Sequence, residues 1–142
     1  VVTMAQEGHA ILIPCGHGKP SKKGIRDVLL PYMKDVGKVV DDGEKSHAAI
    51  TSDLGIGREV HTSSETKGME DSLNPMDMVN TVHRFFRMFI HSHGGYARKD
   101  IRDWCNPFAF IFNHHGNLTK MIHDFFDTAL KVRKIIRYRD KN

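Results

Sequence analysis

The stretch GKVVDDGEKSHAAITSDLG, residues 37–55, carries the pattern that decides the fold. Its first part, residues 38–40, predicts a short strand that runs into two aspartates and a glycine. Residues 44–54 predict a helix that closes at Gly55, and residues 58–62 predict another strand. A strand, a helix and a second strand in this order are typical of a right-handed crossover, so we expect an α/β fold whose sheet has a parallel portion.

The residues on the N-terminal side of this unit predict a β-hairpin and a helix. Residues 1–5 and 9–15 are short apolar runs on either side of a Gln-Glu-Gly turn, which is a hairpin pattern. Residues 16–21 have the composition of a loop, and residues 24–34 place apolar side chains at helical spacing. The α/β pattern therefore extends to the start of the sequence.

The C-terminal half of the chain predicts helices. Residues 62–75 are polar and predict a long loop, after which the pattern is helical from Met76 onward. One apolar stripe on this helix consists of Val79, Val82, Phe86 and Phe89. A second helix is expected over residues 98–112, where Pro107 should kink or split it. A last helix is expected over residues 117–138. Its inward-facing side chains are expected to be Leu118, Ile122, Phe125, Ala129, Val132 and Ile136.

The bulk composition indicates a single folded domain without a membrane span. The chain has 142 residues, 39% of them hydrophobic, which is enough to bury a core. No apolar run approaches the roughly 18 residues that cross a bilayer, and the first residues do not resemble a signal peptide. We therefore expect a cytoplasmic protein. Cys15 and Cys105 lie far apart in the sequence, and we expect both to be reduced and buried.

The positive charge is concentrated at the C-terminus. The formal net charge is +4, and residues 131–142 alone contribute +5, from six basic residues and one Asp. The basic residues are Lys131, Arg133, Lys134, Arg137, Arg139 and Lys141. Such a tail can hold a polyanion through phosphate contacts. The alternative is a solvated helix end whose cations suit the negative pole of the helix dipole.

Two groups of polar residues are candidates for chemistry. Asp42 follows a strand directly, and ligands of open α/β sheets gather at the carboxyl ends of strands. The alternative is a turn-forming role, since Asp-Gly is a favoured turn dipeptide. Asn80, His83 and Arg87 share one stripe of the helix from Met76, continued by His91. The alternative there is the ordinary polar face of an amphipathic helix.

Three segments of this sequence resemble one known family. Residues 39–47, VVDDGEKSH, resemble the VV-T-D-G-x-x-S-Y segment around the second acid of the DDE-type insertion-sequence transposases of the ISXO-like group. Residues 74–89 resemble that group's NP-x-x-x-VN-x-x-H-x-x-x-K helix. Residues 104–108, WCNPF, resemble the Y/W-L-N-x-F segment that follows it. The resemblance covers about residues 1–113, with few gaps.

The resemblance implies an RNase H-like fold and a triad of metal ligands. Asp42 matches the second acid, and Asn80 matches the third ligand in the subgroup that uses Asn there. Arg87 stands where Lys is usual, and His83 matches the motif's His, with a supporting role near DNA or metal. The implied activity is DNA cleavage and strand transfer of an insertion sequence. The implied partners are the transposon ends and target DNA, bound by a homo-oligomer.

The residue types suit this chemistry. Phosphodiester hydrolysis and strand transfer use two Mg²⁺ ions roughly 3.5–4 Å apart. Hard cations prefer oxygen ligands, which the Asp42 carboxylate and the Asn80 amide carbonyl supply. Arg87 can grip a phosphate bidentately where Lys would act as a point charge.

Two departures from the family pattern affect the expected activity. The Thr before the second acid is Asp41 here, which adds a negative charge beside the expected metal ligand. The family's first catalytic Asp lies on a strand upstream of the part that matches Val1, and this sequence has no residues there. We therefore expect residues 1–113 to form a partial RNase H-like catalytic domain, a mixed sheet lacking its first strand, and residues 114–142 a C-terminal basic helix. We expect the chain alone neither to cut nor to join DNA.

Two other classes of function compete with the transposase interpretation. Ten histidines suggest a metal-binding protein, but no His-x-x-x-His or Cys-x-x-Cys pair supplies the usual zinc spacing. A DNA-binding module without catalysis would act through the C-terminal helix and its cations.

Overall fold

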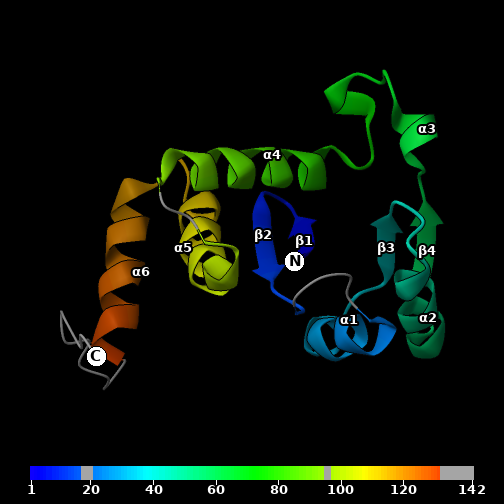
Figure 1. Ribbon diagram of the computed structural model, residues 1–142, viewed down its shortest axis with the longest axis horizontal. Coiled ribbons are helices and arrows are strands. Elements are labelled where there is room, and N and C mark those ends of the chain that lie inside the picture. The colour runs from blue at the N-terminus through cyan, green and yellow to red at the C-terminus, as the bar shows by residue number, and fades with distance from the viewer. Residues whose placement is uncertain (17–20, 95–96, 132–142) are drawn as a thin grey trace.

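The computed structural model describes residues 1–16, 21–94 and 97–131 (Figure 1). Within these residues the chain forms an α/β fold with two separate two-stranded sheets. Helix α4 (Asp77–Ser92) lies over the N-terminal hairpin, and α6 (Leu118–Lys131) lies at the edge of the molecule farthest from the second sheet (Figure 1). No helix in the described ranges combines the length and apolar character needed to cross a membrane.

The first sheet is the expected hairpin. Strands β1 (Val2–Gln6) and β2 (His9–Ile13) pair antiparallel, with Gln6 opposite His9 and Val2 opposite Ile13. The two turn residues, Glu7 and Gly8, have φ of 49° and 80°. Two positive φ values are typical of the type I′ turn, whose twist matches that of the flanking strands.

The second sheet is the expected strand–helix–strand unit. Strands β3 (Lys38–Asp41) and β4 (Gly57–Val60) pair in parallel, and α2 (Lys45–Leu54) connects them. The helix ends at Gly55, whose φ of 65° is the left-handed conformation that glycine adopts without strain. The parallel pairing confirms the prediction from this stretch.

The two strand pairs do not join into one mixed sheet, which corrects that expectation. They are connected instead through a shared core, cluster 1, whose buried members are Val2, Ile25, Leu29, Met33 and Ile50. Leu29 ends α1 (Lys22–Leu29), and a 3₁₀ turn (Leu30–Tyr32) follows it, so the helix expected over residues 24–34 is divided. Proline at the second position of that turn explains the division, because it lacks the N–H that would continue the α-helical ladder.

A second core, cluster 2, holds α4 and α5 (Ile101–Asn113) against the hairpin. Its buried members are Ala10, Leu12, Val82, Cys105 and Phe108. Phe86 and Phe89 pack against it, so the apolar stripe predicted on α4 does face the core. Pro107 was predicted to kink or split this helix; it lies inside α5, which continues through it as one helix, so it does not split the helix. Cys105 is buried as expected, whereas Cys15 is only half-buried.

The segment predicted as a loop, residues 62–75, contains two short helical pieces. They are α3 (Ser63–Thr66) and a 3₁₀ turn (Asp71–Leu73). Thr62 and Glu65 form a capping box, in which each side chain accepts a hydrogen bond from the other residue's backbone N–H. This local motif explains why a polar segment becomes helical. A further 3₁₀ turn (Arg98–Asp100) precedes α5.

Helix α6 is mostly exposed, which overturns the predicted inward face. Leu118 is 65% exposed and Phe125 is 57% exposed, and none of the residues of α6 is buried. Its contacts with the α5 end of the chain include the one between the Phe110 and Phe125 rings and the bond between His114 and Asp124. The apolar periodicity correctly predicted a helix, but no described element covers the apolar face of that helix. Residues 132–138 of the predicted helix lie outside the described residues.

Candidate metal site at the end of β3

Asp41 is the last residue of β3, and its side chain is turned inward. It is 4% exposed and accepts three hydrogen bonds. Arg58 of β4 donates two of them, Nε to Oδ2 at 2.7 Å and Nη2 to Oδ1 at 2.8 Å, and the backbone N–H of Gly43 donates the third to Oδ1 at 2.7 Å. Burial by itself would raise the pKa of Asp41, but the hydrogen bonds from Arg58 and Gly43 outweigh it and lower this pKa. Asp41 is therefore an ionised carboxylate that is fixed in place by Arg58.

Asp42 comes directly after β3, and its side chain is exposed. One oxygen accepts a weak hydrogen bond from the backbone N–H of Glu44 at 3.3 Å, which leaves most of its acceptor capacity available. Gly43 turns the chain next to it with a φ of 90°, and a Cβ there would lie 3.2 Å from Val60. The turn therefore requires glycine at this position.

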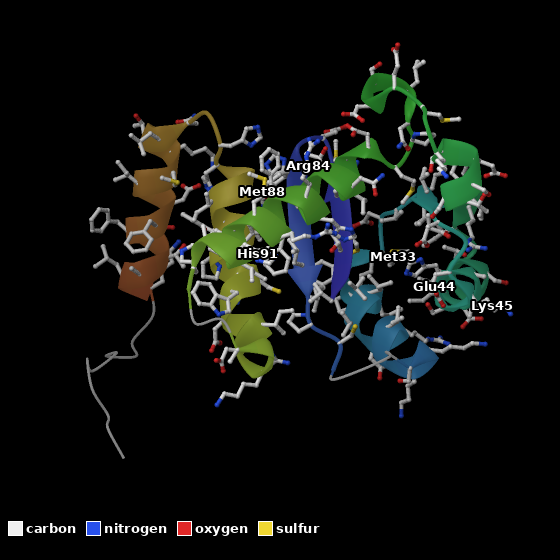
Figure 2. The ribbon with its side chains drawn as sticks, turned by 45° about the horizontal axis from the view of Figure 1, so that its top comes forward. Met33, Glu44, Lys45, Arg84, Met88 and His91 are labelled. Atoms are coloured by element: carbon white, nitrogen blue, oxygen red, sulfur yellow. The ribbon has the colours of Figure 1, made fainter. Side chains whose placement is uncertain are left out.

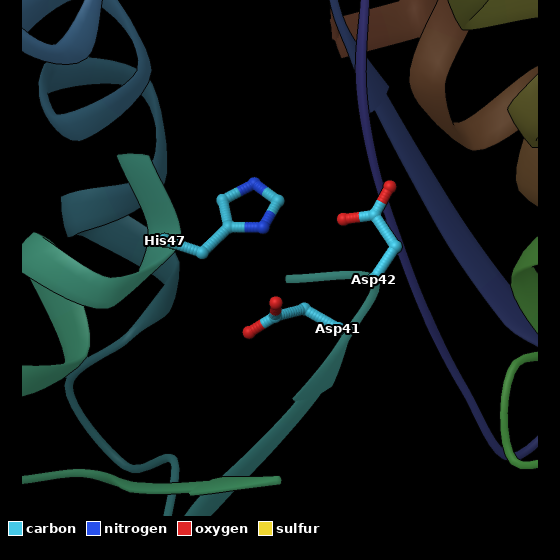
Figure 3. Close-up of side chains that lie close together, drawn as sticks. All are labelled: Asp41, Asp42 and His47. Carbon is cyan, nitrogen blue, oxygen red and sulfur yellow. The ribbon is translucent and has the colours of Figure 1, made fainter. Parts of the chain in front are cut away.

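His47 lies in the first turn of α2, and its side chain is the third member of a cluster with Asp41 and Asp42. Figure 3 shows its ring directed toward the two carboxylates. Its Nδ1 atom is buried and has no hydrogen-bond partner, the only such side-chain atom found in the described part of the chain. A buried polar atom without a partner is rare in folded proteins, and a bound ion is one of its ordinary explanations.

The three side chains form a compact set of ligand atoms. One atom each of Asp41, Asp42 and His47 lies within 4.8 Å of the other two (Figure 3). Asp41 has one lone pair left on Oδ2 after its three hydrogen bonds, while Asp42 has most of its acceptor sites free. Asp42 and His47 are therefore the stronger donors, and Asp41 can add a single oxygen.

The polar stripe of α4 lies on the same side of the molecule as Asp42. His83 Nε2 lies 2.9 Å from the hydroxyl oxygen of Thr3 on β1. Desolvation of the ring, and then the charge of Arg87, lower the pKa of His83, while the carboxylate of Asp42 acts in the opposite direction. Asp42 is therefore near enough to influence His83. Asn80 lies one helical turn before His83 and is exposed.

The remaining predicted residues lie away from this cluster. His91 is near the end of α4, far from Glu44 and Lys45, where α2 begins (Figure 2). Lys131 forms an ion pair with Asp127 at 2.5 Å on the exposed surface of α6. Arg133, Lys134 and Arg137 lie outside the described residues. His47 and Asp41 were not predicted as ligands, although both belong to the segment that resembles the transposase motif.

Comparison of the chain with protein-family models, with curated proteins and with solved structures finds no significant match in any of the three.

Proposed function

We propose that this chain is part of a divalent-cation-dependent enzyme that acts on DNA phosphodiesters, as the transposases that its sequence resembles do. The observation that carries the proposal is the orphaned Nδ1 of His47, which lies beside two carboxylates where β3 ends. In α/β folds this end of a strand is where ligands bind. The proposal includes the RNase H-like arrangement and the homo-oligomer that the resemblance implies.

The donor set fits one divalent cation. The oxygens of Asp42 and the remaining lone pair of Asp41 suit Mg²⁺ or Mn²⁺, and an imidazole nitrogen favours a first-row transition metal. Mn²⁺ satisfies both preferences. A cation bound there would activate an attacking hydroxyl and stabilise the leaving oxygen. A second cation would need a further ligand, and Asn80 on α4 is the proposed source.

Each protein group has a defined part in this proposal. Asp42 and His47 bind the cation, while Arg58 neutralises Asp41 and so limits the negative charge beside them. His83 and Arg87 are proposed to contact the DNA backbone, because they follow Asn80 along one stripe of α4. Lys131 and the basic residues beyond it, Arg133, Lys134 and Arg137, would add phosphate contacts. The DNA would be the transposon ends and the target.

Mn²⁺ binding tests the site directly. Paramagnetic Mn²⁺ should broaden the NMR signals of residues 41–47 first, and Asp42→Asn or His47→Gln should weaken Mn²⁺ affinity at least tenfold. Asp53→Asn is the matched control, since Asp53 lies on the same helix as His47 and pairs with Arg26 outside the cluster. Equal affinity in all four proteins would overturn the assignment.

DNA binding tests the function separately. Binding of a short duplex should be stronger with Mn²⁺ than with EDTA, and Asp42→Asn should remove the difference. We expect no nicking by the chain alone. Binding that is insensitive to metal and is lost only when residues 131–142 are removed would favour the non-catalytic DNA-binding module instead.

A further inference from the structure

The guanidinium group of Arg58 borders two of the elements that carry the candidate metal ligands. Arg58 is in register with Val39, which shares one face of β3 with Asp41, so its side chain runs along that face. Its Nε and Nη2 atoms donate to the two carboxylate oxygens of Asp41. The same Nη2 atom also donates to the backbone C=O of Glu44, the residue before α2, at 3.3 Å. Arg58 therefore lies against the end of β3 and the start of α2 at once.

These contacts occupy most of the acceptor capacity of Asp41. A carboxylate has about four acceptor sites. At Oδ1 the backbone N–H of Gly43 and the guanidinium of Arg58 both donate, and at Oδ2 Arg58 donates again. A cation can therefore receive a single bond from Asp41, but not the two-oxygen contact that a free carboxylate offers. The more open donors of the cluster are Asp42 and His47 (Figure 3).

The charge of Arg58 also opposes a cation at this place. The carboxylates of Asp41 and Asp42 and the guanidinium of Arg58 together carry a formal charge of −1. Hydrogen bonds to Asp41 raise the pKa of Arg58, and the charge of Asp42 adds to this shift. Arg58 therefore acts electrostatically on both carboxylates, and it repels any cation that they attract.

Withholding one carboxylate does not affect all divalent cations equally. Mg²⁺ is a hard ion that is bound by oxygen ligands, so its affinity depends strongly on the carboxylates that a site offers. Co²⁺ and the neighbouring first-row ions also bind imidazole nitrogen well. The Nδ1 atom of His47 is free to supply that nitrogen. The site as built is therefore poor in oxygen ligands but retains its nitrogen ligand.

We propose that Arg58 sets the cation preference of this site, by holding Asp41 back from the metal so that ions that bind imidazole are favoured over Mg²⁺. This inference rests on the proposed function, because it requires a cation at Asp42 and His47. Arg58 is a positioning residue here, since it contacts Asp41 and not the cation. Loss of a residue that only supports the fold would weaken the binding of every ion, whereas loss of Arg58 strengthens the binding of Mg²⁺.

The test compares Mg²⁺ and Co²⁺ binding to the full chain and to Arg58→Gln. Electron paramagnetic resonance of free Mn²⁺ gives the Mn²⁺ affinity, and displacement of bound Mn²⁺ gives the affinities for Mg²⁺ and Co²⁺. Arg58→Gln removes the positive charge and releases Asp41. We therefore expect the Mg²⁺ affinity to rise at least tenfold. The ratio of Mg²⁺ to Co²⁺ affinity should rise at least threefold.

Two controls show whether the gain comes through Asp41. Arg58→Gln combined with Asp41→Asn removes the whole ion pair and keeps the formal charge, so the Mg²⁺ affinity should return to within threefold of the original. Arg26→Gln removes an arginine that pairs with Asp53 outside the cluster, and both affinities should stay unchanged. Arg58→Lys is the second variant, for the case that Arg58→Gln does not fold. Its ammonium group is a point charge that cannot hold both oxygens, so the affinity ratio should rise there too.

Unchanged or weaker Mg²⁺ binding by folded Arg58→Gln would overturn the proposal, as would an unchanged affinity ratio in Arg58→Lys. A gain that persists in the double variant would overturn it as well, because Asp41 would then not be its source. If either result is found while Mn²⁺ binding still depends on Asp42 and His47, the role of Arg58 alone is refuted. Absence of Mn²⁺ binding in every one of these proteins would refute the proposed site together with it.

Discussion

Arg58, near the start of β4, and Asp41, the last residue of β3, form a two-point ion pair that ties the two parallel strands together beneath the candidate metal site. Because three hydrogen bonds occupy Asp41, the two adjacent aspartates have different roles. Asp41 ties β3 to β4 through Arg58, whereas Asp42 is open to a ligand.

Loss of this ion pair should destabilise the fold. Arg58→Gln removes two charge-assisted hydrogen bonds from a buried carboxylate, and such bonds contribute about 1.5–3 kcal/mol each. We expect the free energy of unfolding in urea to fall by roughly 2–4 kcal/mol. Arg26→Gln is the control: Arg26 and Asp53 are each about half exposed, so that variant should lose less than about 1 kcal/mol. Equal losses would contradict the structural role of Asp41.

Asn113 should be essential for joining α5 to the hairpin. Asn113→Ala leaves the N–H and C=O of the buried Ala10 without partners, at about 1–3 kcal/mol for each unsatisfied group. The midpoint temperature of thermal unfolding should therefore fall clearly. Asn117→Ala removes only the exposed cap of the Lys120 N–H, which is worth about 1 kcal/mol, and serves as the control. A larger shift for Asn117→Ala would refute the role of Asn113 in joining α5 to the hairpin.

The pKa of His83 should report on two neighbouring charges. Arg87→Gln removes a positive charge and should raise this pKa, whereas Asp42→Asn removes a negative charge and should lower it further. Arg84→Gln, on the same helix, is the control and should leave it unchanged. The measurement is an NMR titration of the His83 ring. If Asp42→Asn leaves the pKa of His83 unchanged, Asp42 is not near the polar stripe of α4. The proposed site then loses the ligands and phosphate contacts assigned to α4.

The attachment of α6 should weaken in acid. Hydrogen bonds from Lys120, His114 and His123 hold the pKa of Asp124 below its usual value of 3.8. A depressed carboxyl pKa contributes stability that is full above 3.8 and is lost as pH falls below it. The protection factors of the α6 amides, which correct for the slower chemical exchange in acid, should therefore fall as the pH is lowered through this range. Asp124→Asn should exchange faster already at neutral pH and lose this acid dependence, whereas Asp127→Asn should retain it.

The sequence alone determined the elements and part of the candidate site. The hairpin, the β3–α2–β4 unit and the core-facing stripe of α4 all follow from local periodicity and turn chemistry, which act between residues close in the chain. The position of Asp42 at the end of a strand follows from the same pattern.

Only the tertiary structure decided the rest. It brings Arg58 to Asp41 and leaves Nδ1 of His47 unpaired beside two carboxylates. It also separates the strands into two pairs with a cavity between them and leaves the apolar face of α6 exposed. The physical reason is that periodicity states which face of an element is apolar but not which other element covers it. Partners joined through space, such as Ala10 and Asn113 at 103 residues' separation, depend on how the whole chain packs.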